Sequence, residues 1–426
     1  MASGLLFLTF IICLMLNMPI AISLGTAALL GAAIMDIVPV EFLAQASVTS
    51  VDSFPLMAVP FFILAGDIMG TGGVSKRLLN LGNKIVGSMH GGLAIVTIIT
   101  CMVFAAISGS GPATVAAIGS IMIPAMIQQG YDPGFSAALN ACSGTLGPII
   151  PPSIIFIVYG IVAEVSISDL FLAGFLPGFI MTGALCLTAY VISRKRGYRG
   201  LDHRASFREV LEAANEAKYG LLMPIVILGG IYGGIFTPTE AAIIAVDYGL
   251  IVGIFIHKEM HLRDLWDVLR RSALTSGSVL IIVGLATVFG NLLTLEGVPM
   301  AVANFIVSLS NNKYVILFLI NIFLLFVGCV MESLAAIIIL TPILLPVVKA
   351  VGVDPLHFGI ILAVNLVIGM VTPPVGVNLF VASSVSKLRV EVIAKNAVPF
   401  IGTLLVALAI VTYVPWFSLV LVQVFK

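Results

Sequence analysis

The sequence aligns with itself when it is shifted by 222 residues. In that register, residues 104–157 meet residues 326–379 without a gap. A repeat at a fixed offset indicates a duplicated structural unit, so we predict a chain of two related halves. The pairs that hold the register are Pro124 with Pro346, Gly130 with Gly352, Asp132-Pro133 with Asp354-Pro355, Gly147 with Gly369, Pro151-Pro152 with Pro373-Pro374, and Pro177 with Pro399.

Lipid must surround most of this chain, because 60% of its residues are apolar and only 9% are charged. A soluble domain carries roughly 25% charged residues. The 20 basic and 20 acidic residues cancel, which leaves no overall field for nucleic acid. The five cysteines show no CxxC spacing, so they are interpreted as small buried apolar residues.

The lengths of the apolar segments predict the membrane spans, since crossing the hydrocarbon takes about 20 residues. Two stretches, 91–128 and 315–348, are too long for one span, and each is interrupted near its middle. No basic region of a signal peptide precedes the first segment. The expected spans are 3–17, 18–35, 54–72, 133–163, 169–193, 219–236, 240–257, 276–295, 355–385 and 397–421.

The basic residues predict the orientation of the two halves. Of the 20 lysines and arginines, 17 lie in 73–90, 194–218, 258–275 and 386–396, which the positive-inside rule places in the cytoplasm. That placement requires five spans in each half, hairpins that open to opposite sides, and both termini in the periplasm. The second half is therefore predicted to be upside down relative to the first.

These observations predict an all-α polytopic membrane protein of two inverted repeats, each with a re-entrant helical hairpin. Inverted repeats with discontinuous helices are typical of secondary transporters. The expected divisions are a first repeat at 1–196 with its hairpin at 91–128 and a broken helix at 133–163, a cytoplasmic linker at 197–218, and a second repeat at 219–426 with its hairpin at 315–348 and a broken helix at 355–385.

Two connecting segments, 73–89 and 259–273, place apolar residues on one helical face and charges on the other. Amphipathic helices of this kind lie in the membrane interface. Each segment is interpreted either as a helix that simply lies there or as an arm that braces a moving part against a static one.

Four segments rich in Gly, Ser and Pro interrupt the apolar pattern in repeat-related pairs. They are Ser108–Thr114 and Cys142–Ser153 in the first half, and Gly328–Ser333 and Gly369–Asn378 in the second. One such cluster can be a kink or a close helix contact, but four in symmetric pairs favour a site. Broken helices expose carbonyl oxygens, which suit Na⁺, and helix N-termini, which suit a carboxylate.

Acidic residues at depth are functional candidates, because burying a charge in a bilayer costs at least about 2.5–3.5 kcal/mol. Glu332 lies beside the second predicted hairpin tip, where it could help bind Na⁺, cap the tip amides or lie in a wetted mouth. Asp247 is expected to hydrogen-bond to a neighbouring helix, and Asp67 lies near a span end. The breaks contain no Lys or Arg, so an anionic substrate would need helix termini, hydroxyls and bound cations, which favours Na⁺ coupling.

Several long motifs resemble the large membrane subunit of tripartite ATP-independent periplasmic (TRAP) transporters, and the likeness covers nearly the whole chain. They are DSFPLMAVPFFILAGDIM (52–69), SGSGPATVAAIGSIMIPAM (108–126), GTLGPIIPPS (144–153), IYGGIFTPTEAA (231–242) and GMVTPPVGVNLF (369–380).

The resemblance implies an elevator mechanism in a bacterial inner membrane, driven by Na⁺ and with no organic cofactor. It implies import of a carboxylate-bearing solute, with sialic acid and C4-dicarboxylates as the leading candidates. A soluble periplasmic binding protein would deliver the solute. A small four-helix membrane subunit is also implied, and it is expected to be a separate polypeptide because the chain begins directly at the large subunit.

The resemblance also assigns residues. Ser108, Ser110, Ser143 and Ser153 match serines that line the first cation site and the substrate cavity. Thr114 stands where some sialic-acid importers have an Asp, which leaves the substrate open.

Glu332 stands where some relatives have an Asp, and Thr372 lies in the second broken helix. The predicted substrate residues are Ser110, Gly111, Ser143, Gly144, Thr145, Ser153, Thr372 and Asn378. The predicted Na⁺ residues are Ser108, Gly109, Gly147, Pro148, Glu332, Ser333, Gly369, Thr372 and Gly376.

The sequence also bears on three alternatives to a tripartite transporter. A self-sufficient Na⁺/dicarboxylate symporter of related inverted-repeat fold remains open. An ATP-driven pump is disfavoured because no GxxxxGK[ST] loop is present. An intramembrane hydrolase needs a base at depth, whereas the histidines fall in predicted loops or at span ends; they are His90, His203, His257, His261 and His357.

Overall fold

The computed structural model describes residues 2–35, 38–198, 200, 205–309 and 312–425, and these residues form helices and connecting loops without a strand. Within these described residues, seven helices are long and apolar enough to cross a membrane, and a bent pair at 40–71 could be an eighth span. Four of the basic residues and histidines named above lie outside the described residues, namely Arg199, His203, Arg204 and Lys426.

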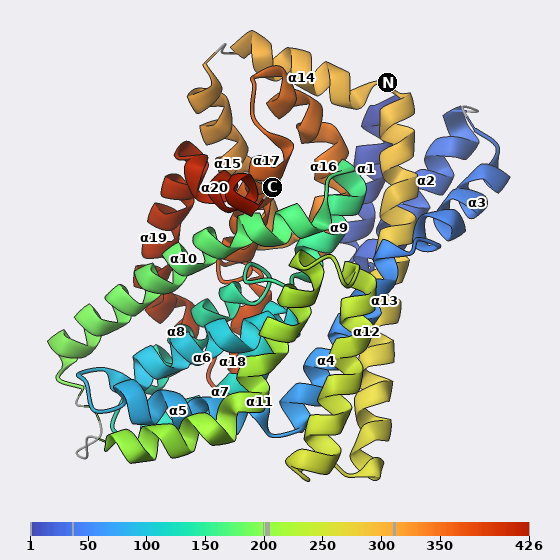
Figure 1. Ribbon diagram of the computed structural model, residues 1–426. Helices are drawn as coiled ribbons and strands as arrows, with labels where there is room; N and C mark the ends of the chain where they lie inside the picture. The colour runs from blue at the N-terminus through green and yellow to red at the C-terminus, as the bar shows by residue number, and fades with distance from the viewer. Residues whose placement is uncertain (1, 36–37, 199, 201–204, 310–311, 426) are drawn as a thin grey trace.

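The first half contains one hairpin, α6 and α7, and one broken helix, α8 and α9 (Figure 1). The bounds are α1 Ala2–Met15, α2 Ile20–Met35, α3 Val40–Val51, η1 Pro55–Met57, α4 Ala58–Thr71, α5 Val74–Val86, α6 Gly92–Ser108, α7 Gly111–Gln128, α8 Pro133–Ser143, η2 Gly144–Leu146, α9 Ile154–Ala163 and α10 Ile167–Arg196.

The second half repeats this plan with the hairpin α15 and α16 and the broken helix α17 and α18. The bounds are α11 Phe207–Tyr232, α12 Pro238–Leu250, η3 Ile251–Ile256, α13 Leu262–Leu295, α14 Val298–Leu309, α15 Lys313–Val330, α16 Ser333–Ala350, α17 Pro355–Gly369, α18 Val377–Ser386, α19 Val390–Tyr413 and α20 Trp416–Phe425.

Residues that match at the 222-residue offset have the same role in local structure, as helix caps and in cis proline pairs. Asp132 caps α8 by accepting a hydrogen bond from the Phe135 amide at 2.7 Å, and Asp354 caps α17 by accepting one from the Leu356 amide at 2.7 Å. Each is followed by a proline, which suits the first turn of a helix because it lacks the N–H that would go unpaired there. Both Pro-Pro pairs, at 151–152 and 373–374, contain a cis peptide bond.

The helices form two groups that meet along a seam. The hairpin group contains both hairpins and both broken helices with α10, α19 and α20, and its members pack on one another. The scaffold group contains α1–α4 and α11–α13, and in Figure 1 its long helix α13 runs along one side of the molecule. Helix α13 packs against α2, α3 and α4 of its own group and against α16 of the hairpin group.

The segment 259–273 is not a separate interface helix, and that prediction is wrong. Helix α13 begins at Leu262 and continues without a break to Leu295, a run of 34 residues that spans about 51 Å. The amphipathic beginning and the apolar remainder are therefore parts of one rod. Helix α5 does form as a separate helix, and it packs between α11 and α6 with Val74 and Leu78 buried. Its interpretation as a bracing arm stays a prediction.

Other helix bounds differ from the expected spans. Helix α3 was missed because its polar residues, among them Glu41, hide the apolar pattern, and α14 was missed because it lies between predicted spans. The expected span 397–421 divides into α19 and α20 around Pro415, since proline lacks the donor that a continuous helix needs. Residues 207–218, which were expected in the linker, form the first part of α11.

The two candidate acids of the scaffold behave differently. The Asp67 carboxylate on α4 accepts a hydrogen bond of 2.6 Å from Ser272 on α13. Asp247 is exposed on α12, and no hydrogen bond joins its side chain to another helix in the described part of the chain. The expectation of a helix–helix hydrogen bond at Asp247 is therefore not met.

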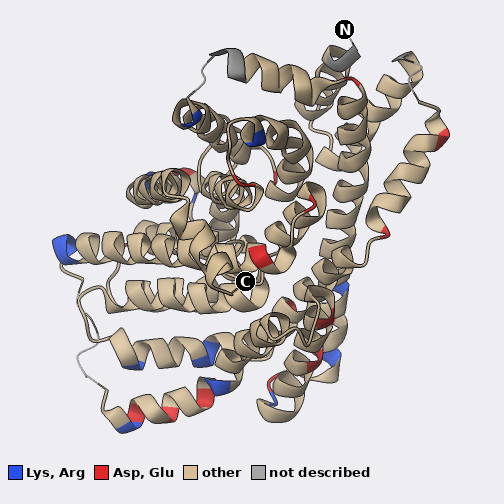
Figure 2. Cartoon of the chain, turned by 45° about the horizontal axis from the view of Figure 1, so that its top comes forward, with Lys and Arg blue, Asp and Glu red and all other residues tan. Residues whose placement is uncertain are grey.

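Basic residues gather at one end of the molecule. In Figure 2 most blue segments lie in the lower half of the view, on α5, at the end of α10 and at the beginnings of α11 and α13. At this end Glu259 binds Arg77 at 2.7 Å and Lys76 at 3.2 Å. Burial acts to raise the pKa of the Glu259 carboxyl, but the hydrogen bonds and charges of Arg77 and Lys76 outweigh it and hold that pKa below its ordinary value.

This ion-pair cluster predicts a pH effect on stability. Because the folded pKa of Glu259 is lowered, its stabilisation is complete above the unfolded carboxyl pKa of about 4.3 and is lost as the pH falls through the lower folded pKa. An exposed pair contributes about 0–1 kcal/mol, so Glu259→Gln should lower the thermal midpoint in detergent slightly at pH 7 and by less at pH 3. Glu296→Gln is the control. A deficit of Glu259→Gln that persists unchanged at pH 3 would contradict the pairing.

Candidate functional site

The first hairpin tip lies directly on the first broken helix. Gly109 has a φ of 59°, a conformation that favours glycine, and a Cβ added there would lie 3.0 Å from the carbonyl oxygen of Pro152. A Cβ added at Gly147 would overlap the backbone of Ser110. Only glycines permit this approach, so the tip and the break act as one unit.

Hydroxyl groups and a carbonyl close the first tip. The Oγ of Ser108 lies 3.0 Å from the Oγ1 of Thr114, and Thr114 donates to the carbonyl oxygen of Ser110 at 2.8 Å. The Oγ of Ser110 caps α7 by accepting from the Ala113 amide at 3.5 Å. Ser108 and Thr114 are buried, so these oxygens lie inside the protein.

The hydroxyls of the first broken helix donate to their own backbone. Ser143 donates to the Leu139 carbonyl at 2.7 Å, Thr145 donates to the Cys142 carbonyl at 2.6 Å, and Ser153 donates to the Pro148 carbonyl. A hydroxyl that donates its proton keeps lone pairs free to accept. All three side chains are fully buried, and the Oγ of Ser153 also accepts a hydrogen bond from the Phe156 amide at 3.3 Å.

Asn378 joins the second broken helix to the first. Its Nδ2 donates to the carbonyl of Ala141 at 3.3 Å. Its Oδ1 lies 3.2 Å from where a Cβ on Gly111 would be, and its Nδ2 lies 3.2 Å from where a Cβ on Gly144 would be. The buried Oδ1 has no hydrogen-bond partner among the described residues. Three predicted substrate residues, Gly111, Gly144 and Asn378, are thus brought together.

The second hairpin tip packs on the second broken helix. Gly369 lies against the backbone of Gly328, and the Val375 amide donates to the Cys329 carbonyl at 3.2 Å. Thr372 donates to the Ile368 carbonyl at 2.8 Å. Gly376, with a φ of 61°, leads into α18 without a side-chain cap.

Glu332 caps the returning helix of the second hairpin. One carboxylate oxygen accepts hydrogen bonds from the amides of Leu334 at 2.9 Å and Ala335 at 3.1 Å. Of the three roles considered for Glu332, the structure shows the cap. Ser333, the next residue, is buried in the first turn of α16.

A cavity of about 280 Å³ lies where the two tips, the two broken helices and the scaffold meet. Five predicted residues line it, namely Gly109, Ser110, Gly111, Pro148 and Glu332. The other predicted residues do not line the cavity; they are Ser108, Ser143, Gly144, Thr145, Gly147, Ser153, Ser333, Gly369, Thr372, Gly376 and Asn378.

The scaffold side of the cavity was missed by the sequence analysis. Thr275 and Ser278 from α13 line it together with Ile63 from α4. Hydroxyl residues recur along α13 at helical spacing, and this pattern could have indicated that one face of the helix is polar. Without a partner helix in view, periodicity cannot show that this face meets the hairpin tips.

A buried polar network in the second half was also missed. Asn365 donates to Asn321 at 2.9 Å, and Asn321 donates to Thr412 at 3.1 Å. His357, buried near the start of α17, contacts Ser418 at 3.1 Å. Asn365 matches Ser143 at the 222-residue offset, so the register itself could have pointed to this position.

The fold is shared with solved membrane transporters. The YdaH transporter of Alcanivorax borkumensis is similar with a TM-score of 0.67 at 14% identity, covering 88% of each chain. MtrF of Neisseria gonorrhoeae is similar with a TM-score of 0.60 at 15% identity, covering 87% of this chain and 84% of that one. At such identities the likeness shows the fold alone, which is that of a multi-pass helical membrane protein.

The family follows from the sequence profile of the tripartite ATP-independent periplasmic transporter, DctM component, which matches residues 7–417. The chain belongs to this family, so it is the large permease subunit of a TRAP transporter and not an enzyme. As a member of this family with seven apolar helices of spanning length in the described part of the chain, it is a multi-pass protein of the inner membrane.

Three relatives illustrate the range of names in the family. The chain is 52% identical over 410 residues to the isethionate TRAP transporter permease protein DctMQ of Oleidesulfovibrio alaskensis, of whose length it covers 65%. It is 42% identical over 434 residues to the C4-dicarboxylate TRAP transporter large permease protein DctM of Rhodobacter capsulatus, covering 98% of each. It is 38% identical over 409 residues to the sialic acid TRAP transporter large permease protein SiaM of Vibrio cholerae, covering 96% of each.

The contact between α15 and α17 predicts that Gly369→Ala destabilises the protein. The added Cβ would overlap the Gly328 backbone, and overpacking of this kind costs roughly 1–3 kcal/mol. The thermal midpoint in detergent should fall. The matched control is Gly402→Ala in α19, where no atom of the described residues outside the local helix backbone lies within 4 Å of an added Cβ. Equal thermal midpoints for the two variants would show that the close approach does not exist.

Proposed function

We propose that this TRAP permease imports a small organic anion together with Na⁺, and that the hairpin group moves as an elevator against the scaffold group. The observation that carries the proposal is the cavity, because residues of both tips, both broken helices, α4 and α13 line it at once. A site on the seam between two packed groups changes its exposure when one group slides past the other.

The chemistry of the lining supports an anion paired with cations. None of the described residues that line the cavity is Lys or Arg. Val377 lies in the lining, in the first turn of α18, whose amides have no side-chain cap. Such a helix N-terminus carries a partial positive charge that suits a carboxylate or a sulfonate.

The position of the Glu332 carboxylate in the cavity lining supports a bound cation. The Glu332 side chain lines the same cavity, and a second carboxylate there would be repelled by it. A Na⁺ ion between tip and substrate would offset that repulsion. Serine hydroxyls and the carbonyls freed at the ends of α6, α8 and α17 are hard oxygen donors of the kind that Na⁺ prefers. We propose Ser108, Gly109, Gly147 and Pro148 for one ion. For another we propose Glu332, Ser333, Gly369, Thr372 and Gly376.

The substrate class is a small organic acid. Relatives are named for C4-dicarboxylates, sialic acid and isethionate, so carboxylates come first and a sulfonate is included. We propose that a periplasmic binding protein delivers the solute and that a small membrane subunit extends the scaffold. We place the basic segments in the cytoplasm and both termini in the periplasm. The rival is a self-sufficient symporter of related fold.

Uptake into proteoliposomes tests this function. The chain, reconstituted with a small membrane subunit, should accumulate a labelled acid only when an inward Na⁺ gradient and a matching binding protein are both present, because the ions neutralise the site and the protein delivers the solute. The measurement is initial uptake with each acid class, with and without the gradient. Uptake that survives collapse of the gradient would refute Na⁺ coupling. Na⁺-driven uptake by the chain alone would favour the rival.

Two variants connect the same assay to the proposed ion sites. Ser108→Ala removes a hydroxyl oxygen and Glu332→Ala removes a carboxylate, so each should raise the Na⁺ concentration required for half-maximal uptake. Ser136→Ala is the control, since that hydroxyl is buried at the start of α8 and donates to the Asp132 carbonyl. Unaltered Na⁺ titrations in both variants would remove these residues from the sites.

A further inference from the structure

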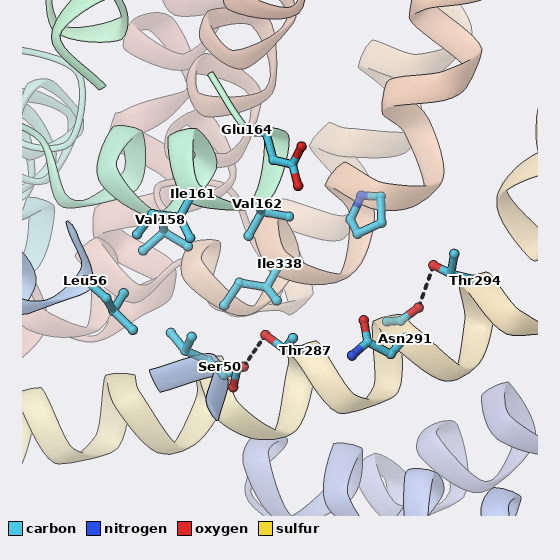
Figure 3. A pocket seen from close by; sticks show the side chains of 13 residues that line it. Ser50, Leu56, Val158, Ile161, Val162, Glu164, Thr287, Asn291, Thr294 and Ile338 are labelled. Atoms are coloured by element: carbon cyan, nitrogen blue, oxygen red, sulfur yellow. Dashed lines mark hydrogen bonds between the residues drawn. The ribbon is translucent and has the colours of Figure 1, made fainter. Parts of the chain in front are cut away.

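Two of the larger cavities are lined by helices that also line the cavity of about 280 Å³, which we call the substrate cavity. The acidic vestibule, of about 370 Å³, lies between α9 and α16 of the hairpin group and α3 and α13 of the scaffold (Figure 3). The basic vestibule, of about 500 Å³, lies between α6 and α7 of the hairpin group and α4, α5 and α13. We name them by Glu164 in the first and by Lys76 and Arg271 in the second.

Continuous helix faces connect each vestibule to the substrate cavity. Along α16, Leu334 lines the cavity, and Ile338 and Pro342 line the acidic vestibule. Along α9, Ile154 lines the cavity and Val158 the vestibule. Residues three or four apart share one face of a helix, so these linings follow single faces.

The basic vestibule is built from matching positions of the other half. Along α7, Pro112 lines the substrate cavity, and Ala116 and Ser120 line the basic vestibule. Adding the 222-residue offset to these three positions gives the three α16 positions of the acidic route. In Figure 1, α9 and α16 lie in the upper part of the view and α5, α6 and α7 in the lower part. The two vestibules therefore lie on opposite sides of the substrate cavity, and the basic one is at the end with the basic segments.

The two ends of the route differ in charge. Glu164 is the only formally charged residue among the described residues that line the acidic vestibule or the neighbouring cavity of about 510 Å³. The basic vestibule holds Lys76, Arg271 and Asp67. Asp67 accepts from Ser272 at 2.6 Å, and Lys76 is paired with Glu259 at 3.2 Å.

Glu164 occupies a position that costs backbone strain. It ends α9 with a φ of 55°, and the following amide, of Val165, donates to the Gly160 carbonyl at 3.0 Å. Helix ends of this geometry ordinarily use glycine or asparagine. The Glu164 carboxylate forms no ion pair or hydrogen bond within the described ranges, and Figure 3 shows it directed toward the vestibule.

From this geometry we infer that Glu164 is an electrostatic guard of the acidic vestibule, which keeps free organic anions out of the outer end of the route. The inference rests on the proposed function for the identity of the excluded ligand, a small carboxylate or sulfonate. An anion in the vestibule meets one uncompensated negative charge and no cationic side chain from the described lining. Solute released there by a docked binding protein bypasses this barrier, whereas free solute must cross it.

Thiol labelling tests the guard without requiring transport. Asn291→Cys places a thiol on α13 in the vestibule lining, and it reacts with an anionic sulfonate reagent or a cationic ammonium reagent of similar size. Adding Glu164→Gln should change the ratio of the two rates toward the anion by about three- to tenfold at low salt, with a smaller change at 1 M salt. An unchanged ratio overturns the proposal.

Three controls sharpen the labelling measurement. Protein without the new cysteine gives the background of the five native thiols. Glu41→Gln removes a carboxylate in the first turn of α3, about 13 Å along that helix from Ser50 in the lining, and should leave the ratio unchanged. Glu164→Gly removes the charge at a backbone position that glycine favours, so it should fold and should reproduce the shift seen with Glu164→Gln.

A second test of the guard measures uptake of free acid in the absence of a binding protein. If Glu164 is the guard, Glu164→Gln raises this uptake several-fold, while uptake with the binding protein changes little. If neither the Glu164→Gln variant nor the unmodified permease transports the acid under any condition, the result would count against the proposed function. The labelling ratio still decides on the guard in that case, because it depends only on the charge in the vestibule. Equal free-acid uptake by Glu164→Gln and the unmodified protein contradicts the guard.

Discussion

The structure depends on the requirement that every backbone polar group inside a bilayer finds a partner within the protein. A broken helix in lipid leaves amides and carbonyls unpaired, each at a cost of several kcal/mol. Here the breaks are satisfied by local caps and by one another. The Glu332 carboxylate accepts hydrogen bonds from two amides of α16, and the Ser153 hydroxyl accepts one from the Phe156 amide at 3.3 Å. The Val375 amide donates to the Cys329 carbonyl. The tips and breaks therefore stay together, and the oxygens and helix ends that define the site are gathered by the same contacts.

This constraint also explains the division into two groups. Glycines hold the first tip on the first break and the second tip on the second break, where an added methyl would overlap the facing backbone. The scaffold lines the cavity with side chains of α4 and α13, such as Ile63, Thr275 and Ser278. Gly66 of α4 also approaches the first tip, because a Cβ added there would lie 3.0 Å from the Cα of Ser108. Sliding of one group past the other would therefore have to separate Gly66 from Ser108.

The sequence predicted the elements whose signals are local. Within the stretches expected as hairpins, 91–128 and 315–348, the helices α6–α7 and α15–α16 are interrupted at 108–111 and 330–333. Within the stretches expected as broken helices, 133–163 and 355–385, helices also end and begin again, but the assignment of repeats stays a prediction. Gly, Pro and Asp mark these ends directly, and the repeat marks them twice. The continuity of α13 was missed because its amphipathic beginning and apolar remainder differ in pattern, although no residue interrupts the helix.

The site was predicted in part for a related reason. The breaks were found from their composition, but the reach of Asn378 to Ala141 joins positions 237 residues apart, and only the packed structure shows it. The hydroxyls of α13 and the charge of Glu164 likewise gain meaning from the cavities they line. The inverted orientation of the halves stays a prediction, supported by the basic residues that gather at one end.

The central claim is that the hairpin group moves as one body past α13, and pulsed spin-label distances test it most directly. Labels at Leu187 on α10 and Val398 on α19 lie within the hairpin group, and a label at Leu274 lies on the scaffold; all three side chains are more than 60% exposed. The account predicts one invariant distance between 187 and 398. It predicts two distances between 187 and 274, whose populations shift with Na⁺ and substrate. A single, unchanging distance between 187 and 274 under every condition would contradict it.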